Sequence, residues 1–271
     1  MIARSYLYVP GDRPDRFRKA LESGADAVVF DLEDAVPLAA KDEARSLVAE
    51  ALSRERGSGA EAWVRINTGS RGLDDLKAIA SIGALTGVFV PKATPASLGE
   101  ALSAVGGARV CALVESALGA LQMAAMAGLD GVSELALGEV DLAADLAMSP
   151  SPDGRELWPI RLDAVVASAA HGCSPPVGPV WVDIRDLEGL ASSTEALRRA
   201  GFGARQAIHP TQVSIINKAM SPTPEDLERA AHLLELAEQA GGGAYVDDDG
   251  RMIDEAVLRS ARRLLATVRP R

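Results

Sequence analysis

The sequence predicts an α/β protein, a single (β/α)8 TIM barrel with a C-terminal helical extension. Eight short apolar runs recur along the 271-residue chain, most of them about 20–35 residues apart, which is the length of one βα unit. The runs are continuous rather than alternating, as expected for parallel strands buried on both faces. Because helix-like segments connect them, the repeat favours a closed barrel. The alternative is an open sheet with a second domain.

The eight apolar runs are the expected strands, and the segments between them include the expected helices. The strands are Tyr6–Val9, Ala27–Leu32, Ala62–Ile66, Gly87–Val90, Arg109–Val114, Glu134–Gly138, Val180–Val182 and Gln206–Ile208. The helices are Pro14–Ser23, Ala39–Arg54, Thr94–Val105, Ser193–Ala200 and Thr211–Met220. Thr94-Pro95 is a start signal, with proline in the first helical turn. A segment rich in Ser, Pro, Asp and Gly, Met148–Trp158, is expected to be an insertion loop near the mouth of the barrel.

The last 51 residues exceed what a barrel needs. We therefore expect residues 1–220 to form the barrel and residues 221–271 to form the helical extension. The extension opens with the helix entry Ser221–Glu225, and its helix continues to about Gln239. Three glycines, 241 to 243, form an expected hinge before Tyr245–Arg263. We expect this extension to act as a lid over the mouth of its own barrel or of a neighbouring subunit.

The composition excludes several classes of function. A net charge of −10 without a basic tail argues against nucleic-acid binding, which needs a clustered positive surface. No apolar run approaches the roughly 20 residues of a membrane span, and no signal-peptide-like run precedes the first strand, so we expect a cytoplasmic protein. Two cysteines, Cys111 and Cys173, form no disulfide framework. Aromatic residues are 4% of the chain, so Ala, Leu and Val are expected to fill the core.

Polar or charged residues follow every predicted strand. In strand order they are Asp12 and Arg13; Asp31, Glu33 and Asp34; Arg65 and Asn67; Lys92; Glu115; Glu139 and Asp141; Asp183 and Asp186; and His209. In this fold, catalytic groups lie at the C-terminal ends of the strands. Random placement of charged residues would not give this pattern, which therefore predicts an active site at the mouth of the barrel.

Carboxylates dominate this set, and crowded carboxylates repel one another unless a cation lies between them. Oxygen ligands select Mg2+, Mn2+ or Ca2+ over zinc, and Mg2+ usually takes one or two carboxylates. Glu115 and Asp141, on neighbouring strands, are the predicted metal ligands, with Mn2+ as the alternative to Mg2+. A second interpretation stays open, in which the two carboxylates form ion pairs with Arg65 and Lys92.

Arg65 is the predicted substrate-binding cation at the mouth. Its planar guanidinium suits a substrate carboxylate or a developing enolate oxygen. Its alternative role is an ion pair with Glu33 or Asp34, and both roles are compatible. Lys92 either points into the mouth or has a structural role, and His209 is expected to be structural more often than catalytic. The individual roles of Glu33 and Asp34 stay open.

Seven short segments occur in the order found in one known family, and together they cover almost the whole chain. They are Arg4–Pro14, Asp31–Val36 with Lys41, Val64–Asn67, Val90–Lys92, Val114–Ser116, Gly138–Leu142 and Ile208–Gln212. With these segments the chain resembles the citrate lyase β-subunit-like proteins of the HpcH/HpaI aldolase and citrate lyase superfamily, on the CoA-ester lyase side. Ser116 stands where many relatives have threonine, a change expected to alter little.

The resemblance implies a barrel that assembles as a homotrimer or hexamer and holds Mg2+ on Glu115 and Asp141. It places the substrate-binding arginine of the family on Arg65, which would also stabilise the enolate. It places a catalytic aspartate, lent across a subunit interface, on Asp254 in the C-terminal extension. Less directly, by position more than by motif, it assigns three cations to the CoA moiety: Arg13, Arg16 and Lys19.

The implied function is a Mg2+-dependent carbon–carbon lyase. It would cleave a 3-hydroxyacyl thioester such as malyl-, citramalyl- or citryl-CoA to an acyl-CoA and a 2-oxo acid, or form it by Claisen-type condensation. Two other enzyme functions share the metal site. One is a metal-dependent aldolase acting on free 2-oxo-4-hydroxy acids, and the other is the β subunit of a citrate lyase complex that works on an acyl carrier protein. A non-catalytic binding protein is the remaining alternative.

Overall fold

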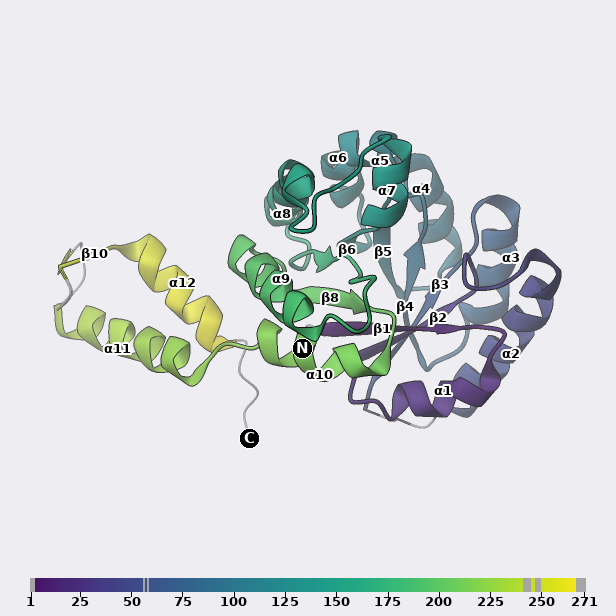
Figure 1. The fold of residues 1–271 in the computed structure, drawn as a ribbon, viewed down its shortest axis with the longest axis horizontal. Helices are drawn as coiled ribbons and strands as arrows, with labels where there is room; N and C mark the ends of the chain where they lie inside the picture. Colours follow the sequence, from purple (N-terminus) through teal and green to yellow (C-terminus); the bar gives the residue numbers. More distant parts are fainter. Residues whose placement is uncertain (1–2, 56, 58, 241–244, 247–249, 267–271) are drawn as a thin grey trace. The chain divides into compact units, whose positions relative to one another are not determined.

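The computed structural model describes residues 3–55, 57, 59–240, 245–246 and 250–266, and it contains a closed barrel of eight parallel strands (Figure 1). The strands are β1 (Ser5–Pro10), β2 (Ala27–Asp31), β3 (Glu61–Arg65), β4 (Leu85–Val90), β5 (Arg109–Val114), β6 (Val132–Leu137), β7 (Val177–Gly178) and β8 (Ala204–Ala207). Each strand pairs in parallel with the next, and β8 pairs with β1 to close the ring. The predicted (β/α)8 barrel is therefore confirmed.

Helices surround the barrel and cover its strands (Figure 1). They are α1 (Pro14–Leu21), α2 (Lys41–Arg54), α3 (Gly69–Ile79), α4 (Pro95–Ala104), α5 (Ala117–Leu121), α6 (Met123–Ala127), α7 (Glu139–Asp145), α8 (Trp158–His171), α9 (Leu187–Ala200) and α10 (Pro210–Met220), with 3-10 turns at Leu38–Ala40 and Arg155–Leu157. The Thr94 start signal is confirmed, because Thr94 and Ser97 form a reciprocal capping box at the start of α4. The predicted insertion loop contains one of the 3-10 turns, and α8 begins at its last residue.

The seventh strand was predicted in the wrong place. The expected run Val180–Val182 is not a strand, and Val182 is 66% exposed. The observed β7 ends at Gly178, because the following residue, Pro179, has no N–H to continue the ladder. The eighth strand also lies earlier than predicted, at Ala204–Ala207, since its Arg205 and Gln206 hide it from a search for apolar runs.

The interior of the barrel differs from the expectation of an Ala, Leu and Val core. Tyr6, Trp63 and Phe89 pack edge to face there, with ring centroids 5.5 Å apart in each pair. Small side chains face them, among them Ala27 and Ala136. The expectation holds instead for the layer between strands and helices, which is rich in Val, Leu and Ala. Few aromatic residues suffice because one cluster fills the narrow interior.

A second compact unit begins at Ser221, directly after α10. It contains α11 (Pro224–Ala240), a two-stranded antiparallel ribbon of β9 (Tyr245–Val246) and β10 (Met252–Ile253), and α12 (Glu255–Ala266). Leu233, Ile253 and Leu258 form its small buried cluster. The predicted glycine hinge lies outside the described residues. None of the helices that the structure describes is both long and apolar enough to cross a bilayer.

The aromatic cluster depends on a glycine in β4. A Cβ atom placed on Gly87 would overlap the ring of Trp63. We predict that Gly87→Ala lowers the free energy of unfolding by about 1–3 kcal/mol, because a well-packed core resists added volume. Gly99→Ala is the matched control, because Gly99 lies in α4 with open space around it and alanine favours a helix. Urea unfolding of both variants checks this, and equal effects would contradict it.

Candidate active site

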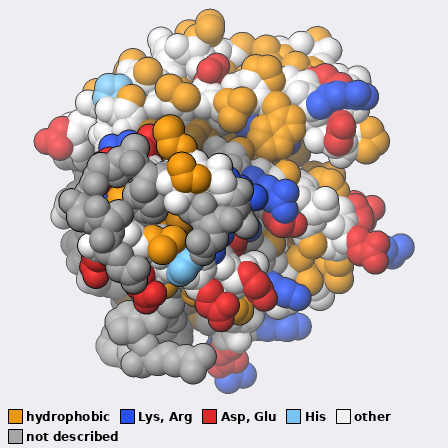
Figure 2. Space-filling model, turned by 90° about the vertical axis from the view of Figure 1, so that its left-hand side faces the viewer, with side chains coloured by type: hydrophobic (Ala, Val, Ile, Leu, Met, Phe, Trp, Pro, Cys, Tyr) orange, Lys and Arg blue, Asp and Glu red, His pale blue; other side chains and the backbone are white. Residues whose placement is uncertain are grey.

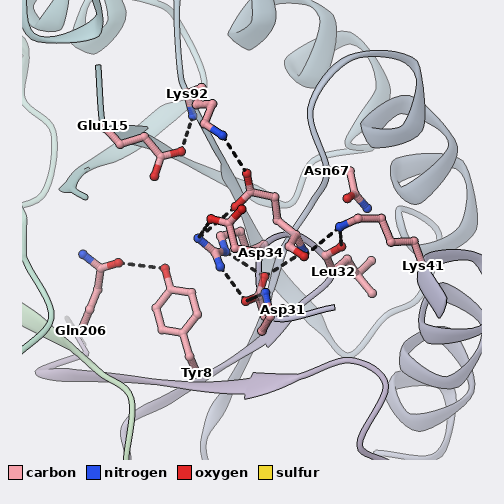
Figure 3. Close-up of polar contacts among 12 residues, drawn as sticks. Tyr8, Asp31, Leu32, Asp34, Lys41, Asn67, Lys92, Glu115 and Gln206 are labelled. Carbon is pink, nitrogen blue, oxygen red and sulfur yellow. Dashed lines mark hydrogen bonds and ion pairs between the residues drawn. The ribbon is translucent and has the colours of Figure 1, made fainter. Parts of the chain in front are cut away.

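The C-terminal ends of the strands converge on a cluster of charged side chains at the mouth of the barrel (Figure 3). Asp31 and Arg65 are the last residues of β2 and β3, whereas Lys92 and Glu115 follow β4 and β5. Figure 3 shows Asp31, Lys92 and Glu115 around a common centre, with Tyr8 and Gln206 on one side of it. The charged groups thus gather at the end of the barrel where the sequence predicts the site.

Arg65 is held by a carboxylate that the sequence did not single out as its partner. Its Nε and Nη2 donate to the two oxygens of Asp31 at 2.8 and 2.6 Å, a bidentate pair. Asp31 is only 2% exposed, and it also accepts from the backbone N–H of Glu33 at 2.9 Å. Burial opposes the charge of Arg65, but its bonds to Asp31 outweigh this and raise the pKa of the guanidinium.

The ion pairs expected as the alternative role of Arg65 are also present. Its Nη1 lies 3.0 Å from Oε2 of Glu33 and 3.5 Å from Oδ2 of Asp34. The contact with Glu33 is at ion-pair distance but lacks hydrogen-bond geometry, so this buried oxygen has no hydrogen-bond donor among the described residues. Burial, reinforced by Asp34, raises the pKa of Glu33 to about 7. Arg65 therefore balances several carboxylates only in part.

A lysine fixes the loop that carries these acids. Nζ of Lys41 donates to the carbonyl oxygens of Leu32 and Glu33 at 2.9 and 2.7 Å (Figure 3). Both carbonyls follow β2 directly, so the ammonium ion holds the backbone of Glu33 in place. Sequence reasoning noted Lys41 only as part of a motif, since nothing local shows that its side chain reaches back nine residues.

Glu115 is 3% exposed and sits in a space made by two backbone features. The N–H of Lys92 donates to its Oε1 at 2.7 Å, and Lys92 has a φ of 47°, a left-handed conformation that non-glycine residues rarely adopt. On the other side, a Cβ on Gly138 would lie 2.8 Å from both Cβ and Oε2 of Glu115. A strained lysine and an obligatory glycine thus define the position of this carboxylate.

The charge of Glu115 is not balanced by a salt bridge. Burial and then the charge of Glu33 raise its pKa to about 7, and Asp141 contributes to the same shift. Asp141 is exposed in the first turn of α7, and neither acid forms a salt bridge with a cation in the described part of the chain. The alternative in which Glu115 and Asp141 form ion pairs with Arg65 and Lys92 is therefore wrong. Lys92 contacts Glu115 only through its backbone N–H, and its ammonium group lies 3.5 Å from Oε1 of Glu33.

Several other polar groups at the strand ends have structural partners. Glu139 forms a bidentate pair with Arg161 at 2.6 Å, and Asp186 caps α9 by accepting from the N–H of Gly189. Nδ1 of His209 accepts from the N–H of Thr211 at 3.3 Å in the first turn of α10, consistent with the structural role expected for it. The remaining members of this group are Asn67, which donates to the buried Asp75, and Asp183, which accepts from the N–H of Arg185.

The residues expected to reach the CoA moiety lie on α1 and at its start. Arg13, Arg16 and Lys19 are three residues apart and exposed, so they share one face of the helix. Arg13 forms a salt bridge with Asp15 at 3.0 Å. Asp254, the expected catalytic base, lies in the second unit, where its carboxylate accepts from the N–H of Val257 and caps α12.

Buried acids and a guanidinium gather at the C-terminal ends of the strands of this closed barrel. This is the arrangement typical of (β/α)8-barrel enzymes. The chain belongs to the HpcH/HpaI aldolase/citrate lyase family, whose profile matches residues 4–210. The resemblance drawn from the seven segments is thereby confirmed.

Two curated relatives and one solved structure illustrate the range of this family. Citrate lyase subunit beta of Leuconostoc mesenteroides subsp. cremoris is 32% identical, over 97% of this chain and 92% of that protein. The (3S)-malyl-CoA thioesterase of Cereibacter sphaeroides is 34% identical, over 97% and 93%. The crystal structure of CitE from Mycobacterium tuberculosis with magnesium, acetoacetate and coenzyme A superposes with a TM-score of 0.83, at 33% identity, over 97% of each chain.

The raised pKa of Glu115 makes the stability of the metal-free protein depend on pH. An unfolded glutamate loses its proton near pH 4.5, whereas folded Glu115 keeps it until about pH 7. Between these values the folded chain binds more protons, so the stability that this group contributes falls as pH rises. Glutamine cannot ionise. We therefore predict that, as pH rises from 4.5 to 8, the free energy of unfolding of Glu115→Gln increases by up to about 3 kcal/mol relative to that of wild type.

Urea unfolding in EDTA at a series of pH values measures this difference. Glu100→Gln, at an exposed position on α4, controls for the loss of one negative charge. A difference between Glu115→Gln and wild type that stays constant with pH would show that Glu115 is already ionised in the folded protein.

Proposed function

We propose that this chain is a Mg2+-dependent carbon–carbon lyase that cleaves a 3-hydroxyacyl thioester to an acyl-CoA and a 2-oxo acid, or forms it by Claisen-type condensation. The observation that carries the proposal is the state of Glu115, a buried carboxylate without a cationic partner, beside a guanidinium at the mouth of a barrel. The likeness to CitE, which was crystallised with magnesium and coenzyme A, supports the same function.

Glu115 and Asp141 fit a magnesium ion. Oε1 of Glu115 is engaged by the N–H of Lys92, while its Oε2 accepts no hydrogen bond from the described residues. Mg2+ usually takes one or two carboxylates from a protein and leaves its other positions to water and substrate, so this pair is a sufficient set. When bound, the ion would supply Lewis-acid chemistry to the oxygens of a 2-oxo acid. Mn2+ is the alternative ion for the same ligands.

Arg65 has the position and the charge to stabilise an enolate. Asp31 fixes its plane through two hydrogen bonds and keeps it ionised. Asp31 uses two of its five N–H groups and Asp34 uses a third, so two remain for a substrate oxygen. One well-placed donor of this kind is worth roughly 3–4 kcal/mol in the transition state.

Asp254 is the proposed base. In condensation it would take the α-proton of the acyl thioester, the resulting enolate carbon would attack the carbonyl carbon of the 2-oxo acid, and the carbonyl oxygen would take up a proton from solvent to become the 3-hydroxyl group. In cleavage the 3-hydroxyl group would lose its proton to solvent as the same carbon–carbon bond breaks, and the protonated Asp254 would give its proton to the α-carbon of the acyl-CoA enolate. We propose that a neighbouring subunit supplies Asp254, with its C-terminal unit acting as a lid that excludes water during the reaction.

A homotrimer or hexamer is the proposed assembly. Exposed apolar side chains support it, since Leu162 and Val166 lie one turn apart on the outer face of α8, and Leu121 on α5 is 86% exposed. Figure 2 shows hydrophobic side chains in the upper half of the face that it views. Large exposed apolar patches commonly mark contacts between proteins.

The cations Arg13, Arg16 and Lys19 are the proposed contacts for the phosphates of CoA.

Three variants test the roles in the site. Asp254→Asn should fold and bind Mg2+ normally, since asparagine caps a helix as well as aspartate, yet lose turnover by roughly 10²–10⁴-fold. Glu115→Gln and Asp141→Asn should instead weaken Mg2+ binding. Calorimetric Mg2+ titration and a lyase assay on a panel of CoA thioesters measure both effects, with the exposed Asp163→Asn on α8 as control. Full activity of Asp254→Asn would exclude it as the base.

Thioester hydrolysis is the second candidate, because a relative 34% identical to this chain is named a malyl-CoA thioesterase. The two reactions give different products from (3S)-malyl-CoA. A lyase releases acetyl-CoA and glyoxylate with the thioester intact, whereas a thioesterase releases malate and free CoA. We predict acetyl-CoA and glyoxylate in equal amounts, measured by chromatography of the CoA species. Malate and free CoA as first products would favour hydrolysis.

The two other enzyme functions predict different behaviour in the same assays. An aldolase for free 2-oxo-4-hydroxy acids would cleave those acids but not their CoA relatives. A β subunit working on an acyl carrier protein, as suggested by the match to citrate lyase subunit beta, would copurify with carrier and transferase subunits.

A further inference from the structure

The barrel wall is incomplete where β6 and β7 approach its mouth. The two strands share one register pair, Ala136 with Val177, and β7 ends one residue later. Pro179 has no N–H, so the backbone cannot extend the ladder there. The carbonyl groups of Leu137 and Gly178, which end these strands, therefore need donors from elsewhere.

Two consecutive side chains of β8 replace the missing rungs. Nε2 of Gln206 donates to the carbonyls of Leu137 and Gly178 at 2.9 and 3.0 Å. Nε of Arg205 donates to the carbonyl of Pro179 at 3.0 Å. Because neighbouring residues in a strand point to opposite faces, these two side chains hold the end of β7 from inside and outside the barrel. Both N–H groups of the Gln206 amide are consumed, which fixes its orientation.

The side-chain oxygen of Gln206 connects the ends of β6 and β7 to Arg65. The hydroxyl of Tyr8 donates to Oε1 of Gln206 at 2.8 Å (Figure 3). The ring of Tyr8 lies under the guanidinium of Arg65, with Cζ 5.2 Å from the ring centre, a cation–π contact. A continuous chain of contacts thus runs from the carbonyls of β6 and β7 through Gln206 and Tyr8 to the Arg65–Asp31 pair.

The same amide also bears on Glu115. It holds the carbonyl of Leu137, and the next residue, Gly138, is the one whose missing side chain leaves room for Glu115. The N–H of Gly138 donates to the carbonyl of Val114, the residue before Glu115, at 2.9 Å. Displacement of Leu137 would therefore move the wall against which Glu115 rests.

We propose that Gln206 and Tyr8 are positioning residues that hold Arg65 and the wall behind Glu115 in a fixed relation across the mouth. This inference rests on the proposed lyase function, since Arg65 and Glu115 act in that reaction. Neither Gln206 nor Tyr8 needs to touch the reacting atoms. Their loss should therefore lower kcat through misplacement of the two groups, while the affinity for the thioester changes little.

Steady-state kinetics of Tyr8→Phe, Gln206→Leu and the double variant test the proposal. Tyr8→Phe keeps the ring under Arg65 and removes only the hydroxyl. Its kcat should fall by about 10- to 100-fold, the effect of a small misplacement, with KM changed by less than about 2-fold. If the residues form one chain, the double variant should be little worse than the poorer single variant.

Tyr6→Phe is the matched control. Tyr6 is also an interior tyrosine of β1, but its hydroxyl donates to Glu134 at the opposite end of the barrel, at 2.8 Å. This variant should lose stability and keep kcat. If Tyr8→Phe matched Tyr6→Phe in kcat, a purely structural role would be established and the proposal overturned. If Gln206→Leu failed to fold, Tyr8→Phe would still decide.

A crystal structure of Tyr8→Phe separates failure of this proposal from failure of the proposed function. A wild-type protein inactive on every thioester would refute the lyase function alone. In that case a displaced Arg65 guanidinium in Tyr8→Phe would still support positioning, and an unmoved one would overturn it.

Discussion

The mouth of the barrel holds more carboxylate than the described cations nearby can balance, and this imbalance governs the arrangement of the site. Asp31 takes the bidentate bond of Arg65, which leaves Glu33 with an ion pair lacking hydrogen-bond geometry and Glu115 with a single backbone N–H. Burial then raises the pKa of Glu33 and Glu115 to about 7. A divalent cation would relieve this cost, so binding of the ion and release of protons are linked.

The fold and the end of the barrel at which the charged side chains gather could be predicted because both follow from a simple repeat. Apolar runs at the spacing of βα units give the strands, and parallel strands bring their C-terminal residues together. The Arg65–Asp31 pair was within reach of the same reasoning. Asp31 ends a fully buried run and is the register partner of Arg65 on the next strand, and a buried carboxylate needs a cation.

Other features could not be predicted because they depend on contacts that leave no local pattern. β7 is two residues long, and its ladder is replaced by Gln206 and Arg205, which read in sequence as polar interruptions of an apolar run. The left-handed backbone of Lys92 carries no sequence signal, since glycine or asparagine would be expected there. The strained backbone of Lys92 directs its N–H at Glu115, a contact that only the structure shows.

The two ends of the barrel differ in the partners that they give a buried glutamate, although burial raises the pKa of both Glu134 and Glu115. At the closed end, Glu134 accepts from the hydroxyl of Tyr6 and pairs with Arg109, which also contacts Glu61 and lies 4.7 Å from the ring centre of Trp63. Each of these three charged residues has a side-chain partner. At the open end, Glu115 has no such partner although it is equally buried.

Buried polar groups are ordinarily satisfied, and an unpaired carboxylate costs free energy that selection for stability alone would remove. The same chain satisfies Glu134 in the same barrel, so the fold is able to provide partners for an interior glutamate. Its failure to do so for Glu115 is therefore specific to the mouth. Such a departure is expected where a ligand completes the coordination of the group, which makes the unbalanced acid the main observation behind the proposed site.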